Sequence, residues 1–423
     1  MDTDISIKKD PYIALRFPEF RFFLGMRFFL TLAYQIQAVI VGWHIYHLTK
    51  DPLSLGMIGL AEAIPAIGIA LYGGYVADKS EKTSILKLIL ISIFFASFVI
   101  FLVTLPVIET RFTPGQIVIA IYTMIFLIGI ARGFMGPTVF SLMALIIPRE
   151  HYPNSSTWNS TSWQIASIAG PAAGGLLYGN LGVSVTFLVI LIFLLVSFSC
   201  IFFLKKREPQ FVPKENIFKS LNEGIKFVFN SRMMLGAMSI DLFSVFFGGA
   251  VALIPVIASE VLHVGAEQFG LMRAAPALGA VLTMLVMTRH SPMEKPWRNL
   301  LLAVMGFGIS IICYGLSTNF YLTLFFLFLE GAFDSVSVVI RSTIMQLLTP
   351  DQMRGRVSAV NSMFIGSSNE LGAFESGLTA KYMGTVPAVV FGGSMTLLIV
   401  TATYLKTKKL IRLGVKEIHA PES

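Results

Sequence analysis

Two ten-residue stretches decide how this chain folds: GLAEAIPAIG at residues 59–68 and GLMRAAPALG at residues 270–279. Six of the ten positions are identical, and the stretches are offset by 211 residues. A second set of matches, offset by 202 residues, pairs Pro148, Ser156, Asn159, Ser160, Gly170, Gly175, Leu176 and Gly182 with Pro350, Ser358, Asn361, Ser362, Gly372, Gly377, Leu378 and Gly384. The chain therefore consists of two related halves.

The composition places both halves in a membrane. Of the 423 residues, 55% are hydrophobic and 13% are charged, whereas about 25% of residues are charged in an ordinary soluble domain. The mean hydropathy is +0.75. These values exclude a soluble globular protein, a disordered chain and a nucleic-acid-binding domain. They leave a protein whose main partner is the lipid bilayer.

Apolar segments of transmembrane length recur along the whole chain, since about 20 apolar residues cross a bilayer as a helix. No alternating ten-residue pattern of the barrel kind occurs, so helices are the spanning option. We predict an all-α membrane protein with twelve transmembrane helices in two pseudo-symmetric six-helix bundles. The twelve segments cover approximately residues 20–48, 53–78, 84–107, 115–147, 152–180, 183–205, 233–262, 266–289, 297–317, 319–348, 354–382 and 386–406.

One long polar break, residues 206–231, divides the halves. Within it, Ile217, Leu221, Ile225 and Val228 recur at helical spacing among charged residues, which predicts an amphipathic helix lying on the membrane surface. The predicted organisation is a first bundle at 1–205, a linker with this helix at 206–231, and a second bundle with a polar tail at 232–423.

The net charge of +8 reflects orientation rather than an anionic partner. Lys and Arg gather in alternate loops, for example at Lys79, Lys82 and Arg149, and at both ends of the chain. Cytoplasmic loops carry this excess. We therefore expect a multi-pass protein of the plasma membrane (the inner membrane of a bacterium) with both termini in the cytoplasm and no nucleic-acid partner.

Three motifs carry a family resemblance. Residues 73–82, GGYVADKSEK, resemble the loop after helix 2 of the major facilitator superfamily, and residues 170–175, GPAAGG, resemble the Gly-Pro-x-x-Gly-Gly motif of its antiporters. Residues 346–357, QLLTPDQMRGRV, are similar to the branch that contains the enterobactin exporter and the macrolide efflux proteins. The resemblance implies gating roles for Gly74, Asp78, Lys79, Lys82, Gly170, Pro171, Gly174, Gly175, Arg354 and Arg356.

The same resemblance implies a substrate cavity between the halves, lined by the first, fourth, seventh and tenth helices. Parallel repeats place such a site near the middle of the bilayer. These helices supply aromatic and amphipathic side chains that we expect to line the cavity. They are Tyr34, Gln37, Phe134, Phe243, Phe247 and Phe333.

Ionisable residues inside the spans are candidates for mechanism, because a charge at mid-membrane costs about 2.5–3.5 kcal/mol on insertion scales. The candidates for a proton or substrate path are Arg27, Glu62, Arg132, Asp241, Arg273 and Asp334. In the repeat alignment Glu62 matches Arg273 and Arg132 matches Asp334, so opposite charges occupy equivalent positions twice. We expect Arg132 and Asp334 to face each other, either as a proton-sensitive switch or as a permanent ion pair.

The sequence contains no phosphate-binding Gly-x-x-x-x-Gly-Lys loop, nucleophile–base pair or metal-ligand cluster. We therefore expect no cofactor, no metal and no enzymatic activity. The prediction is a monomeric secondary active transporter that exports an amphipathic organic molecule in exchange for protons. By resemblance, that molecule is a siderophore or a macrolide-like drug. The alternatives are an uptake carrier for a small solute and a non-transporting membrane scaffold or sensor.

Overall fold

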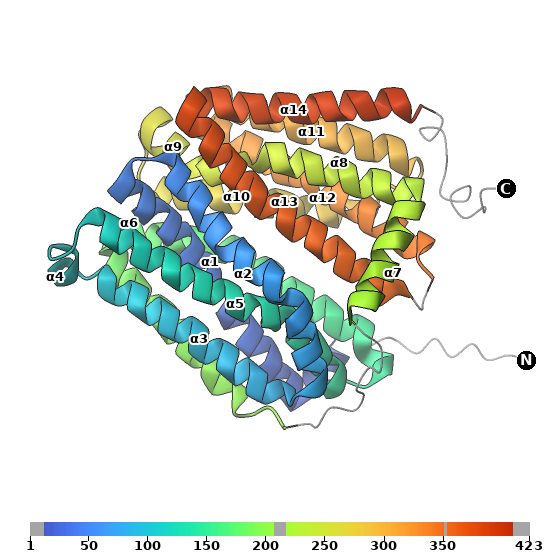
Figure 1. Ribbon diagram of the computed structural model, residues 1–423, viewed down its shortest axis with the longest axis horizontal. Coiled ribbons are helices and arrows are strands. Elements are labelled where there is room, and N and C mark those ends of the chain that lie inside the picture. The colour runs from blue at the N-terminus through green and yellow to red at the C-terminus, as the bar shows by residue number, and fades with distance from the viewer. Residues whose placement is uncertain (1–11, 207–216, 351–352, 409–423) are drawn as a thin grey trace, which may run out of the picture.

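The computed structural model describes residues 12–206, 217–350 and 353–408, and it is almost entirely helical (Figure 1). The first half contains α1 (Pro18–Thr49), α2 (Pro52–Lys79), α3 (Lys82–Val103), the short α4 (Pro106–Glu109), α5 (Pro114–Ile146) and α6 (Tyr152–Ile201). The second half contains α8 (Arg232–Gly248), α10 (Ala266–Met287), α11 (Pro296–Leu316), α12 (Phe320–Leu348), α13 (Arg354–Met383) and α14 (Thr385–Lys406).

These elements make twelve spans because α6 is two helices joined at a glycine. Gly182 has a φ of 78°, a conformation that side chains with a Cβ rarely adopt, and it divides α6 into two crossings. Its repeat partner Gly384 has a φ of 88° and separates α13 from α14 in the same way. The seventh span starts as α8 and continues through the turns Gly249–Leu253, α9 (Ile254–Val256) and Ile257–Val261. The predicted fold is confirmed.

The repeat is visible in the packing of each bundle. In the first, α5 passes so close to α2 that a Cβ on Gly129 would collide with the Glu62 carbonyl and the Pro65 ring. In the second, α12 passes α10 in the same manner, and a Cβ on Gly331 would collide with the Pro276 carbonyl. Small residues allow this close approach of helices in lipid. The two contacts are equivalent under the repeat.

The bundles meet through α2 against α13 and through α6 against α10. At one end of the molecule, which we call the closed end, Gly175 packs on Gly270 and Gly56 packs on Gly377. Hydrogen bonds also join the bundles there, from Tyr46 to Glu260, from Asn180 Nδ2 to Glu267 Oε1 at 2.6 Å and from Lys381 Nζ to Asp51 Oδ2 at 3.2 Å. At the opposite end, which we call the terminus end, α1 begins and α14 finishes.

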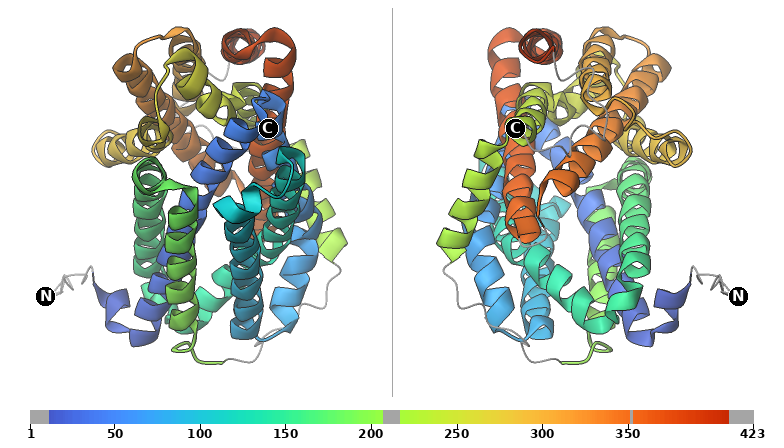
Figure 2. Two further views of the ribbon diagram at one scale, coloured as in Figure 1. Left: turned by 90° about the vertical axis from the view of Figure 1, so that its left-hand side faces the viewer. Right: turned by 90° about the vertical axis from the view of Figure 1, so that its right-hand side faces the viewer.

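Figure 1 shows the bundle of α1, α3 and α5 diverging from the bundle of α8, α11 and α14 towards the terminus end. Figure 2 shows the same two bundles end-on, with the second half above the first. Each bundle has its own apolar core, and the largest cluster in the first half contains Phe20, Phe23, Met26 and Phe187, all fully buried.

The linker helix differs from the prediction of a membrane-surface helix. The segment folds as α7 (Ile217–Asn230), but its apolar side packs on protein. Val228 is fully buried in a cluster with Met234, Met345 and Val357, and a Cβ on Gly224 would lie 3.0 Å from the Arg356 carbonyl. The apolar face of α7 packs on apolar residues of α8, α12 and α13, so this face of α7 is not available to lipid.

The packing at the closed end predicts that Gly175 cannot be replaced by a larger residue without loss of stability. A Cβ there would lie 2.5 Å from the Ala266 carbonyl and 2.6 Å from the Gly270 Cα, and overpacking of this kind costs about 1–3 kcal/mol. Gly175→Ala should therefore lower the thermal unfolding temperature of the purified protein. The matched control is Gly136→Ala, where a Cβ would meet nothing within 4 Å. An equal unfolding temperature for the two variants would contradict the packing.

Candidate functional site

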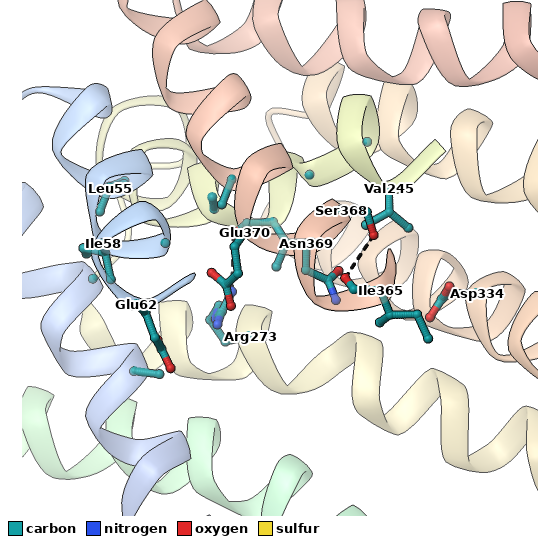
Figure 3. A pocket seen from close by; sticks show the side chains of 18 of the residues that line it. Leu55, Ile58, Glu62, Val245, Arg273, Asp334, Ile365, Ser368, Asn369 and Glu370 are labelled. Carbon is teal, nitrogen blue, oxygen red and sulfur yellow. Dashed lines mark hydrogen bonds between the residues drawn. The ribbon is translucent and has the colours of Figure 1, made fainter. Parts of the chain in front are cut away.

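A cavity of about 500 Å³ lies between the two bundles. It is within the size range of sites for small organic ligands, about 300–1,000 Å³. Residues of α1, α2, α5, α8, α10, α12 and α13 line it, and Figure 3 shows part of this lining. Its charged residues are Glu62, Asp241, Arg273, Glu330, Asp334, Arg341 and Glu370.

The first bundle contributes a triad of Tyr34, Glu62 and Arg132, in which Glu62 is buried. Glu62 on α2 forms an ion pair with Arg132 on α5. Tyr34 on α1 donates a hydrogen bond to Glu62 Oε1 at 2.7 Å and accepts one from Arg132 Nη1 at 2.9 Å. The Arg132 guanidinium also lies over the Tyr34 ring, 5.0 Å from its centroid. Because each member has two partners, the triad fixes α1, α2 and α5 relative to one another.

The second bundle contributes a stripe of charge along α12. Residues 330, 334, 338 and 341 follow helical spacing, and all four line the cavity. Arg341 forms an ion pair with Asp241 on α8, and both side chains are more than nine-tenths buried. Arg341 Nε also donates to Ser337 Oγ at 3.2 Å. Asp334 interacts electrostatically with Arg341 and Asp241.

Arg273 and Glu370 lie between these two groups. Figure 3 shows their side chains pointing towards each other from α10 and α13, and the two interact electrostatically. Arg273 Nη1 donates a long hydrogen bond of 3.4 Å to the Val251 carbonyl. It also interacts with Glu330, whose side chain is buried and whose Oε2 has no hydrogen-bond partner among the described residues. Nearby, the Ser368 hydroxyl donates to the Ile365 carbonyl at 3.0 Å.

The expected pairing of Arg132 with Asp334 is wrong for this structure. Arg132 pairs with Glu62 of its own bundle, and Asp334 lies in the field of Arg341 and Asp241 of its own bundle. The repeat alignment compares positions but not partners, and within each bundle a neighbouring helix supplies the closest opposite charge. Glu62, Asp241, Arg273 and Asp334 do line the cavity, whereas Arg132 contacts it through Glu62 and Arg27 is not among the lining residues.

The cavity-lining prediction holds for Tyr34 and Gln37 and is wrong for four phenylalanines. On α8 the residues that line the cavity are Asp241, Val245 and Gly248. Phe243 and Phe247 each lie two residues after a lining residue, so their side chains point away from the cavity. Phe243 is 48% exposed on the outer surface. Phe247 packs on Phe246 and Phe391.

The other two phenylalanines also pack outside the cavity. Phe333 covers Gly306 on α11, and Phe134 contacts Tyr72. Helix phase, which a list of aromatic residues ignores, decides which side chains reach the site.

The glycines of the 170–175 motif form two helix contacts at once. A Cβ on Gly170 would meet Gln35 Cβ at 2.5 Å, and one on Gly174 would meet Ile36 at 3.4 Å, so this face packs on α1. Gly175 and the Pro171 carbonyl face Gly270 of α10 in the opposite bundle. The motif is therefore positioned where α6 contacts both its own bundle and its partner.

The remaining gating candidates lie at the terminus end. Lys79 is exposed, and Lys82 is buried with its ammonium donating to the Ser80 carbonyl at 3.2 Å. Arg356 forms an ion pair with Glu223 of α7. Gly74, Asp78 and Arg354 are outside the residues whose side chains the structure describes.

Sequence reasoning missed Arg341 and gave no role to Glu330 or Glu370. The sequence did indicate a role for Arg341 and Glu330. Together with Asp334 they lie on one face of α12, at intervals of four and seven residues. For Glu370 the indication in the sequence is the polarity of its helix. Hydropathy recognises ten helices as apolar enough to span a membrane among the described residues, and α13 is not one of them. A polar spanning helix must have a cavity or a protein neighbour beside it.

The fold and the charged central cavity define a secondary transporter of the major facilitator superfamily. The chain belongs to the family described as "Transmembrane secretion effector", which it matches over residues 10–418. It is 24% identical to the enterobactin exporter EntS of Shigella flexneri and to that of Escherichia coli O1:K1, over 90% of this chain and 90% of each relative.

Solved transporters share the fold at low identity. A bacterial homologue of the human lysosomal transporter Spinster, in an inward-facing and unoccupied conformation, has a TM-score of 0.70 at 14% identity, covering 96% of this chain and 99% of that one. A peptide transporter POT in complex with sulfate has a TM-score of 0.73 at 11% identity, with the same coverage.

The triad predicts energetic coupling between Glu62 and Arg132. Glu62→Gln and Arg132→Gln should each lower the thermal unfolding temperature, since removing one partner leaves the other charge unpaired. A fully buried pair would cost about 3–5 kcal/mol, and less is expected here because the Arg132 side chain is 34% exposed.

The double variant Glu62→Gln/Arg132→Gln should lose less stability than the two single changes together. A coupling of about 0.5–3 kcal/mol is typical of residues in contact. Unfolding of the purified variants measures this coupling, and strictly additive losses would show that the pair is not a unit.

Proposed function

We propose that this protein exports an amphipathic organic molecule across the plasma membrane in exchange for protons, by alternating access of the central cavity. The observation that carries the proposal is the cavity itself. It lies between two bundles that are joined by hydrogen bonds and glycine contacts at the closed end, and it contains more carboxylates than arginines. Carboxylates that face such a cavity are the groups through which transporters couple to protons.

The orientation of the loops supports an inward-facing state. Lys79, Lys82 and Arg298 lie at the terminus end, and the excess of positive charge in such loops supports a cytoplasmic location for that end. The cavity then opens towards the cytoplasm and the inner leaflet, where substrate enters. In the opposite state the closed-end bonds, including Lys381–Asp51, separate while the terminus end closes. One chain carries both bundles, so the monomer suffices.

The relatives support export and an organic substrate. The similar proteins named above are enterobactin exporters, and the similarity extends over 90% of this chain and 90% of each relative, which supports a shared mode of transport. We therefore keep siderophores and macrolide-like drugs as the candidate substrates. Asp241 and Asp334 are the proposed proton-binding groups, because Arg341 lies in the field of both and holds Asp241 in an ion pair. Protonation of Asp241 would break this ion pair and free Arg341 to pair with Asp334.

Everted membrane vesicles with an acidic interior test the exchange. Addition of a transported compound should release interior protons, which a pH-sensitive dye reports, and Asp334→Asn should reduce this signal by about tenfold or more. The matched control is Glu375→Gln on α13, a carboxylate outside the cavity lining whose Oε1 accepts a hydrogen bond from Thr379 at 2.8 Å. An uptake carrier would move the compound in the opposite direction.

Two results would overturn the proposal. One is proton release by Asp334→Asn at the full wild-type rate and with unchanged pH dependence. The other is accumulation of the compound in the vesicles without any proton movement.

A further inference from the structure

We propose that the cavity contains a subsite for an organic cation, formed by Glu330 and Asp334 on α12, and that the transported molecule places a protonated amine there. The inference rests on the proposed transport function and specifies the substrate class. Its basis is a combination of charge count, an unpartnered buried carboxylate and the apolar surface beside it.

The charge count of the cavity favours a cation. Five carboxylates line it, and three arginines lie in or beside it among the described residues. Arg132 is neutralised by Glu62, and Arg341 is neutralised by Asp241. Arg273 then remains as the counter-charge for Glu330 and Glu370, and Asp334 shares the field of Arg341 with Asp241. With every carboxylate ionised, the cavity has an excess of two negative charges, which a bound cation or protons would compensate.

Glu330 is the carboxylate most in need of a partner. Its residue is 6% exposed, and its Oε2 has no hydrogen-bond partner among the described residues. Charged and titratable groups face it from three helices: Arg273 from α10, Tyr314 from α11 and Asp334 from α12. A buried charge without a hydrogen bond is costly. A ligand ammonium group would supply the missing donor.

Asp334 extends this subsite towards an apolar wall. It lines the cavity together with Val245, Phe307 and Asp241, and the same four residues also border a small separate pocket. Asp241 is held by Arg341, so Asp334 is the carboxylate of this pair that is available to a ligand. An amphipathic cation fits the arrangement, with its charge at Glu330 and Asp334 and its apolar body on Val245 and Phe307. The aromatic ring of Phe307 favours a cation further.

An anionic group would find a poorer site. Among the described residues of the cavity, Arg273 is the arginine without an ion-pair partner at contact distance, but Glu370 and Glu330 already share its field. An anion bound to Arg273 would leave the carboxylates on α12 without compensation and close to a further negative charge. Like charges held close in a low-dielectric site repel strongly. Protons and the cation would instead compete for the same two carboxylates.

Two probes of the same shape and opposite charge test the subsite. Tetraphenylphosphonium and tetraphenylborate differ in the sign of their charge, so titration calorimetry of the purified full-length protein compares cation and anion directly. Neither ion has an N–H group, so the pair tests the charge preference of the subsite separately from hydrogen-bond donation. We expect the phosphonium to bind more tightly. Its Kd should rise by about tenfold or more as the pH falls from about 8 to about 5.5, because protons then occupy the carboxylates.

Variants assign the effect to residues. Glu330→Gln and Asp334→Asn should each raise the Kd for the phosphonium by about tenfold, while Glu375→Gln should leave it unchanged. Arg273→Gln should have the opposite sign and lower the Kd, since it removes a repelling charge from the cavity. Unchanged thermal unfolding temperatures of the glutamine and asparagine variants would show that they are folded.

The subsite is refuted if tetraphenylborate binds more tightly, if neither probe binds, or if Glu330→Gln and Asp334→Asn both bind the phosphonium like the wild type. Proton release from everted vesicles decides the export function separately. A compound that is exported with proton exchange, while the phosphonium fails to bind, would retain the transporter and remove the cation subsite.

Discussion

The cost of holding charge inside a membrane governs this structure. Each of Glu62, Asp241, Glu330 and Asp334 lies on a spanning helix, where an unpaired charge is unfavourable by several kcal/mol. An ion pair inside each bundle offsets one of these charges: Glu62 pairs with Arg132 in the first bundle, and Asp241 pairs with Arg341 in the second. The other carboxylates remain at the interface between the bundles, where the composition of the cavity determines whether they are ionised. This division separates a structural charge, Glu62, from a responsive set that also includes Asp241, because protonation would break the ion pair of Asp241 with Arg341.

The packing of the bundles allows the carboxylates of the responsive set to become accessible first from one side of the membrane and then from the other. Close glycine contacts rigidify each bundle, where Gly129 of α5 packs against α2 and Gly331 of α12 packs against α10. The contacts between bundles at the closed end combine glycines with single hydrogen bonds to carboxylates, such as Asn180–Glu267 and Lys381–Asp51. Exposed pairs of this kind contribute little stability. Rigid bundles joined by weak contacts can rock against each other without unfolding.

The sequence predicted the fold through features that depend on local chemistry. Hydropathy marks the spans, and the repeat at 59–68 and 270–279 marks the two halves. Partnership in the site depends on helix phase and on which neighbour is nearest, and these are properties of the packed structure. Arg132 therefore pairs with Glu62 rather than Asp334, and Phe243 faces outward while Asp241 faces the cavity. The surface on which α7 packs could not be predicted from the sequence either, because an amphipathic helix fits lipid and protein surfaces equally well.

We propose that substrate and protons occupy the same carboxylates in the cavity. The most direct measurement is the number of protons released when tetraphenylphosphonium binds, obtained by calorimetry in buffers of different ionisation enthalpy. We expect release of a substantial fraction of a proton per bound cation at mildly acidic pH, and loss of that release in Glu330→Gln/Asp334→Asn. Binding of the cation with no proton released at any pH between about 5 and about 8 would contradict it.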